Sequence, residues 1–494
     1  MNKILIYGLF SKKLPTQLAE RSNFFPSKLS YAKSYITTLP MRTILLTTIC
    51  YLFSYNLIAQ STAFISSTAA TEDINQMITT FEKVHYNPYF KTSKDEFYSL
   101  KKELLDNWST DSISYKQFMA VGMKLCAVMS GGHSYMYWKN PHMVPEIKEY
   151  FYVPFTGKLI NDNQTFVVTE SKIPSIDSGT VVQSINGISM QELFLECMAY
   201  TGGIEAFKIA YTEASLPLFL FFNDKLKAPY SIQLKGSDKP ISTKGMDIGE
   251  LADFINSRQI DQNYTFEILN DKIALISYNS CTNYKKFKKF LKESFKTIAE
   301  QNIDKLIIDI RQNGGGDSRL NDDLLSYLTT KPYQQSSGRY WKVSEEAKKT
   351  YSSHKAYTKI FGKEFMDQYM NTPNQEVIES LDTADLTYPQ KPKNFFEGKS
   401  CLLIGPGTFS SANFLADAVK TYKITTIIGA PSGEYTNDFG EQLNFTLPNS
   451  GSRVFISSTY DIGANGNATV LEPVFPDIHV EDDALTYAVE WIKK

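Results

Sequence analysis

Apolar residues in the second half of the chain fall into short continuous runs separated by amphipathic stretches. A short apolar run bounded by turn residues is typical of a buried strand, whereas apolar residues recurring every three or four positions are typical of a helix. The strands predicted in this way span 273–277, 306–310, 401–404 and 425–429, and the predicted helices span 284–301, 317–328 and 411–422. Strands that alternate with helices favour an α/β core, which we place over 246–494.

The first half of the chain has a different pattern. Apolar residues at helical spacing recur from Ile74 to Met136, which predicts a small helical domain over 61–148. Two β-rich runs follow at 164–169 and 178–187, and the second ends in Asn186-Gly187, a pair typical of tight hairpin turns. With a helix expected from Met190, these runs predict a β-rich module over 149–245. The polar stretch 331–393 is predicted to be an insertion in the α/β core or a lid over its site.

The N-terminus has the pattern of a leader. An apolar run at 44–58 follows Arg42 and precedes small residues, and it is shorter than the ~20 residues of a membrane span. We therefore expect a signal peptide at about 41–60, with 1–60 as the leader and an exported mature protein. Two alternatives stay open: an uncleaved leader that tethers the protein to a membrane, and a start at Met41 rather than Met1.

Composition narrows the function. The 494 residues, 42% of them hydrophobic, can form two or three cored domains. With 51 basic and 53 acidic side chains the net charge is −2, and no clustered basic face indicates a nucleic-acid partner. The five cysteines lack paired C-x-x-C spacing, so we expect neither a metal site nor a disulfide framework, but small buried apolar residues. They are Cys50, Cys126, Cys197, Cys281 and Cys401.

Two segments carry candidate chemistry. One predicted strand ends in Asn313-Gly314-Gly315-Gly316, and another ends in Thr408-Phe409-Ser410-Ser411-Ala412 before a helix. Glycines allow backbone N–H groups to approach a ligand closely, and the second segment presents a hydroxyl at the start of a helix. Together they outline an oxyanion hole and a nucleophile. The alternative for a serine pair at this position is an ordinary helix cap.

These motifs, with Pro476-Asp477-Ile478 after them, resemble the C-terminal-processing (tail-specific) serine peptidase family. The resemblance implies that the α/β core has the spiral ββα arrangement of the Clp peptidase and crotonase superfamily. It also implies that the module over 149–245 is PDZ-like and takes an extended peptide as an added strand. The alternative for the module is a β-rich spacer without a groove.

The same resemblance assigns roles to residues. It implies Ser410 as the nucleophile, with the backbone N–H groups of Gly315 and Ser411 as the oxyanion hole. The family's Ser-Lys branch has a lysine where this chain has Tyr435. We therefore favour the tricorn-like branch, whose histidine segment resembles Gly132-His133-Ser134-Tyr135 and implies His133 as the base.

His133 would titrate near its ordinary pKa, so activity should fall as the pH drops through roughly 6–7. A purely structural His133 is the alternative. For the third member of a triad we select Glu472, with Glu434 as a weaker candidate. Asp309 and Asp477 are expected to be structural acids that hold strand ends and Arg311.

The sequence thus predicts an exported serine peptidase that cleaves peptides, unfolded proteins or protein C-termini through an acyl-enzyme, without a metal or organic cofactor. The alternative is a catalytically inactive relative that binds peptides through the PDZ-like module.

Overall fold

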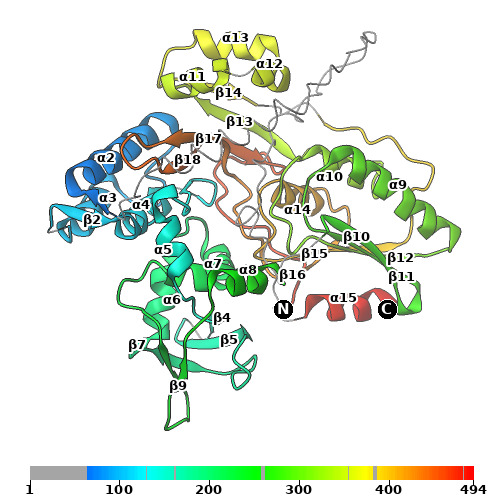
Figure 1. Ribbon diagram of the computed structural model, residues 1–494. Coiled ribbons are helices and arrows are strands. Elements are labelled where there is room, and N and C mark those ends of the chain that lie inside the picture. The colour runs from blue at the N-terminus through cyan, green and yellow to red at the C-terminus, as the bar shows by residue number, and fades with distance from the viewer. Residues whose placement is uncertain are drawn as a thin grey trace, which may run out of the picture.

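The computed structural model describes residues 64–108, 110–129, 131–160, 163–257, 262–353, 355–381, 386–481 and 483–494 (Figure 1). The predicted leader and Cys50 lie outside these ranges. Within them, no helix combines the length and apolar character needed to cross a membrane.

The C-terminal half contains a six-stranded sheet in the order β10-β11-β12-β15-β16-β19. β10 is antiparallel to β11, and every later pair in this order is parallel. The strands are β10 (Tyr264–Leu269), β11 (Ile273–Tyr278), β12 (Lys305–Asp309), β15 (Lys399–Ile404), β16 (Thr426–Gly429) and β19 (Ile478–His479). Four of them coincide with the predicted strands, so the α/β class of this half is confirmed.

Helices cover both faces of this sheet. α9 (Tyr284–Glu300), α10 (Arg319–Leu325) and α14 (Ser411–Thr421) pack on one face, and α15 (Ala484–Lys493) packs on the other (Figure 1). α9 buries Phe287, Leu291 and Phe295 at helical spacing and exposes its lysines. Because both faces are covered, the central residues of the inner strands are apolar and buried.

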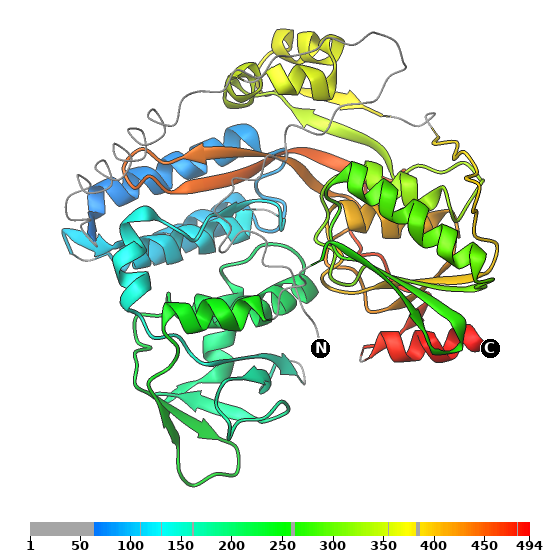
Figure 2. The same cartoon turned by 45° about the vertical axis from the view of Figure 1, so that its right-hand side comes forward.

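A second sheet connects the two halves of the molecule. Its order is β14-β13-β18-β17, and β3 also pairs with β18. In Figure 2 its long hairpin runs from the six-stranded sheet across to the N-terminal helices. The strands are β3 (Tyr135–Met136), β13 (Ser336–Lys342), β14 (Val377–Ser380), β17 (Asp438–Thr446) and β18 (Arg453–Gly463).

The N-terminal part is helical, as predicted. It comprises β1 (Phe64–Ser66), α2 (Ser67–Val84), α3 (Lys94–Asp106), β2 (Ser112–Ser114), α4 (Tyr115–Met129) and α5 (Val144–Glu149). Ser66 caps α2, and Ser93 and Glu96 form a capping box on α3. The core of this part is continuous with that of the β-rich module and the second sheet.

The β-rich module contains two small sheets and three helices. Its strands are β4 (Phe155–Ile160), β5 (Thr165–Ser171), β6 (Val182–Ile185), β7 (Ile188–Ser189), β8 (Tyr230–Leu234) and β9 (Ile241–Thr243), and its helices are α6 (Met190–Met198), α7 (Glu205–Leu220) and α8 (Ile248–Asn256). The predicted Asn186-Gly187 turn joins β6 to β7, with φ of 52° and 80°. Both angles are positive, as a type I′ turn requires.

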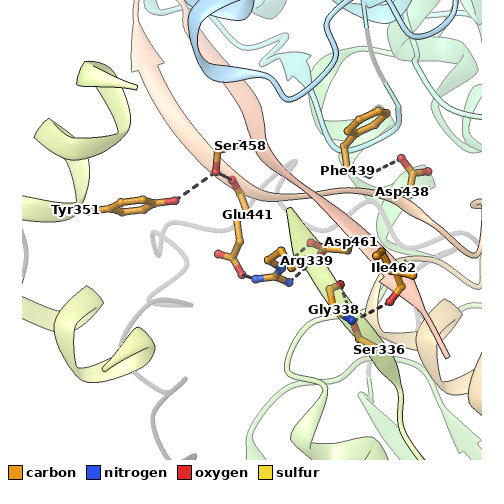
Figure 3. A network of polar contacts seen from close by, with 10 residues as sticks. All are labelled: Ser336, Gly338, Arg339, Tyr351, Asp438, Phe439, Glu441, Ser458, Asp461 and Ile462. Atoms are coloured by element: carbon orange, nitrogen blue, oxygen red, sulfur yellow. Dashed lines mark hydrogen bonds and ion pairs between the residues drawn. The ribbon is translucent and has the colours of Figure 1, made fainter. Parts of the chain in front are cut away.

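The polar stretch 331–393 contributes β13 and β14 to the second sheet and carries α11 (Glu345–Ser353), α12 (Lys355–Phe361) and α13 (Lys363–Asn371). Arg339 of β13 binds Glu441 and Asp461 on β17 and β18, and Tyr351 of α11 meets Ser458 (Figure 3). The inner strand of this stretch is therefore an integral part of the sheet.

Candidate active site

Three turns meet at the carboxyl edge of the six-stranded sheet. They follow β12, β15 and β16, and ligands of α/β proteins bind at this edge. Backbone hydrogen bonds join them: Phe409 N–H donates to Asn313 at 3.0 Å, and Gly433 N–H donates to Thr408 at 3.0 Å. The glycine motif, the serine motif and Glu434 are consequently held together.

Ser410 lies between β15 and α14 in a strained conformation. Its φ is 55° and its ψ is −127°, and a positive φ is uncommon for a residue other than glycine. Its hydroxyl does not cap α14, so the structure does not give it the ordinary role of a serine at a helix start. The neighbouring Ser411 hydroxyl donates to the Gly316 carbonyl at 2.6 Å.

A single carboxylate connects Ser410 with His133. One oxygen of Glu434 accepts the backbone N–H of Ser410, and the other lies 2.9 Å from Nδ1 of His133. Although Nδ1 of His133 and the Glu434 oxygen are this close, the N–H on Nδ1 does not point at the oxygen as a hydrogen bond requires. Only 4% of the Glu434 side chain and 15% of the His133 side chain are exposed. The described residues include no hydrogen bond between the Ser410 hydroxyl and His133, a contact that is often loose before substrate binds.

Pairing with the second sheet holds His133 at this site. The strand after it, β3, pairs with β18 through Tyr135↔Phe455 and Met136↔Val454. Ser457 N–H donates to Ser134 at 2.9 Å, and Gln442 on β17 binds the His133 carbonyl. These contacts fix the histidine segment on a hairpin that begins beside Glu434.

Charges around His133 move its pKa. Burial by itself lowers the pKa of the imidazole, but the charge of Glu434, with Asp438 and Asp461 further away, outweighs burial and raises it to about 9. This differs from the near-neutral value expected from the sequence. Burial and the charge of Glu434 also raise the pKa of Asp438.

The glycine turn lies directly against Ser410. Gly315 has a φ of 93°, and a Cβ added there would lie 2.6 Å from the Ser410 Cβ and 2.8 Å from the Ser411 nitrogen. The position therefore requires glycine. However, Gly315 N–H donates to Oδ1 of buried Asn313 at 2.9 Å. In this conformation the Gly315 N–H therefore already has a hydrogen-bond acceptor and is not available to an oxyanion. The N–H groups of Gly314 and Ser411 have no such partner within the described part of the chain.

The other candidates from the sequence lie elsewhere. Glu472 has an exposed side chain, and its carbonyl accepts the Thr436 N–H. The sequence favoured Glu472 over Glu434 as the third member of the triad. The geometry favours Glu434, because its carboxylate is the one that contacts His133. The ring of Tyr435 makes an edge-to-face contact with the ring of Phe90.

Asp309 and Asp477 have the structural roles expected of them. Asp309 binds the Arg311 side chain with both oxygens, and Asp477 accepts the Ile427 N–H at 2.9 Å. The four described cysteines are buried thiols, as predicted. No group of three or more potential metal ligands forms among the residues that the structure covers.

A strained serine, a buried histidine and a carboxylate on an α/β core define the class of a serine-type peptidase. Residues 272–480 match the sequence profile of peptidase family S41. This part of the chain is therefore similar to the family that the motifs indicated.

Solved structures agree on the fold. Mature CPAF complexed with lactacystin superposes with a TM-score of 0.60 and 14% identity, covering 86% of this chain and 97% of that chain. A second structure of mature CPAF gives a TM-score of 0.57 at 14% identity, covering 86% and 96%. At this identity the likeness establishes a shared mixed α/β fold. The comparison with curated protein sequences gives no match.

Proposed function

We propose that this protein hydrolyses peptide bonds in peptides, unfolded proteins or protein C-termini through an acyl-enzyme on Ser410. The observation that carries the proposal is the position of Glu434, whose two oxygens contact Nδ1 of His133 and the backbone N–H of Ser410. In this assignment Ser410 is the nucleophile, His133 the general base, and Glu434 the acid that orients the imidazole.

The geometry supports different roles for the two ring nitrogens of His133. Glu434 stabilises a proton on Nδ1, which leaves Nε2 to accept the proton of the Ser410 hydroxyl. As Oγ attacks the scissile carbonyl, His133 becomes a cation, and the buried carboxylate stabilises that charge. His133 then returns the proton to the departing amine as the C–N bond breaks. In the second half of the reaction His133 takes a proton from a water molecule that attacks the acyl carbon, and it gives this proton to Oγ of Ser410 as the ester bond breaks and the carboxylic acid leaves.

For the oxyanion hole we propose the N–H of Ser411 together with the glycine turn. Ser411 N–H belongs to the first turn of α14, where helix N–H groups lack intrahelical partners. Within the glycine turn, Gly314 N–H is the available donor in the present conformation, and Gly315 N–H becomes one if Asn313 releases it.

We place the chain in the tricorn-like branch, because a histidine from a remote segment supplies the base and Tyr435 stands where the other branch has lysine. The finer assignment of the core to the spiral ββα arrangement remains part of the proposal. So does a PDZ-like role for the module, which its β6–β7 hairpin and following α6 support. Export is inferred from the sequence at 41–60, and a membrane tether by an uncleaved leader is the alternative.

A fluorophosphonate probe tests the proposal. Purified wild-type protein should be labelled on one serine and should degrade casein, an unfolded protein. Protein that is folded but neither reacts nor degrades casein would favour the alternative of a peptide-binding relative without turnover. Cell fractionation with an antibody would test export separately.

A further inference from the structure

Phe207, on α7 of the β-rich module, lies against the residue before each of the three proposed catalytic residues. Its ring stacks on Phe409, next to Ser410, with centroids 4.6 Å apart and planes at 22°. A Cβ at Gly132, next to His133, would lie 3.3 Å from its Cε1, and one at Gly433, next to Glu434, would lie 3.3 Å from its Cδ2.

The packing around this ring is tight. Phe207 and Phe409 are each only 9% exposed. A Cβ at Gly203, in the loop before α7, would lie 3.0 Å from Cδ1 of Phe207 and 3.5 Å from the Gly132 Cα. The ring is therefore enclosed by glycine backbone at its edges and by Phe409 on one face. A Cβ at any of these three glycines would lie 3.0–3.3 Å from the ring, so the ring would have to shift to accommodate it.

The stack continues to the proposed base. Phe409 also stacks on the imidazole of His133, with centroids 4.7 Å apart and planes at 30°. Phe207, Phe409 and His133 thus form a row of three rings. The first belongs to the module, the second to the nucleophile turn, and the third to the N-terminal part.

We propose that Phe207 is a positioning residue: through Phe409 and the two glycine backbones it sets the relative placement of Ser410, His133 and Glu434. The inference rests on the proposed function of these three residues. It makes the module a structural component of the active site, independent of any peptide that the module binds. A displacement of about 1 Å at a catalytic site can lower the rate roughly 10²-fold.

The test compares phenylalanine-to-alanine variants in the same module. Phe194 on α6 is fully buried, and its ring contact is with Phe166 of β5. Phe194→Ala therefore removes a buried ring from the core of the module, but not one that packs against the three turns of the site. Both variants should be assayed for fluorophosphonate labelling at a temperature where unfolding curves show them folded.

For Phe207→Ala we expect the labelling rate at saturating probe to fall at least tenfold, with the half-saturating probe concentration unchanged. Phe194→Ala should label at close to the wild-type rate. Phe207→Leu retains much of the apolar volume but not the flat ring, so it should fold and show a smaller loss. That variant serves as the test if Phe207→Ala does not fold.

Wild-type labelling rates in Phe207→Ala or Phe207→Leu would overturn the inference, and so would equal losses in Phe194→Ala and Phe207→Ala. These outcomes differ from failure of the proposed function, in which the wild-type protein itself would not be labelled.

Discussion

Nδ1 of His133 lies 2.9 Å from Oε1 of Glu434, although the two residues come from opposite halves of the chain. The contact exists because β3 adds to the hairpin of β17 and β18, which starts a few residues after Glu434. The second sheet therefore assembles the site, and the six-stranded sheet supplies the serine and the glycine turn.

Replacing Glu434 by glutamine should lower kcat by roughly 10²- to 10⁴-fold, because the imidazole loses the charge that orients it and stabilises its cation. The matched control is Glu472→Gln, because Glu472 is exposed whereas the Glu434 side chain is buried. Casein hydrolysis by the two variants distinguishes the acids. A large loss in Glu472→Gln with little change in Glu434→Gln would restore the order expected from the sequence.

The pH dependence should reflect the raised pKa of His133. A general base must be neutral, so kcat/KM should rise with pH up to about 9 rather than level off near 7. In Glu434→Gln, burial of the imidazole is no longer outweighed by that charge, so the rise should move to lower pH. Rates measured across pH 6 to 10 provide the check, and identical profiles for the two proteins would contradict the assignment.

The same shift has a consequence for stability. The pKa of His133 is higher in the folded protein than its ordinary value of 6.5. The contribution of its charge to stability is therefore fully present below about pH 6.5 and is lost as the pH rises through about 9. Accordingly, the loss of stability in His133→Ala should be larger at pH 6 than at pH 10, as thermal unfolding would show.

Alanine at Gly315 should damage both the turn and the chemistry. The new Cβ would approach Ser410 Cβ to 2.6 Å at a φ of 93°, and a displaced oxyanion donor costs about 2–4 kcal/mol of transition-state stabilisation. Gly314→Ala is the matched control, since it has open space around its Cβ and no positive φ. Equal activities of the two variants would place the oxyanion hole elsewhere.

Loss of Arg339 should destabilise the second sheet. Its guanidinium pairs with Glu441 and Asp461 (Figure 3). The side chains of these two acids are 14% and 7% exposed. In Arg339→Met both acids lose this buried cation, which should cost about 3 kcal/mol of unfolding free energy. Breaking the exposed Lys102–Asp106 pair with Lys102→Met should cost under about 1 kcal/mol. Urea unfolding followed by tryptophan fluorescence compares them, and similar midpoints would contradict a structural role for Arg339.

The sequence predicts the α/β core well because its strands are short apolar runs and its helices are amphipathic. The exception is α10, predicted over 317–328 but ending at Leu325 and starting at Arg319. Asp317 instead accepts the Arg319 N–H and so belongs to the turn before the helix. Local pattern thus identifies the element but not its ends.

The hairpin of β17 and β18 and the site it assembles are less visible in the sequence. β18 is buried along most of its length, so it lacks the alternation that marks a half-buried strand. Ser410, Gly315 and His133 stand in recognisable motifs, whereas Glu434 has only its place beside Tyr435. Its contact with His133 depends on pairing between distant segments, and no local signal encodes that.

The most direct test of the account is to identify the residue that a fluorophosphonate modifies, by peptide mass spectrometry of the wild-type protein, Ser410→Ala and His133→Ala. We expect a single adduct on Ser410 in the wild-type protein. We expect no adduct in Ser410→Ala, and labelling slowed by ~10³-fold or more in His133→Ala, with both variants folded. An adduct on another serine, or labelling of His133→Ala at the wild-type rate, would contradict it.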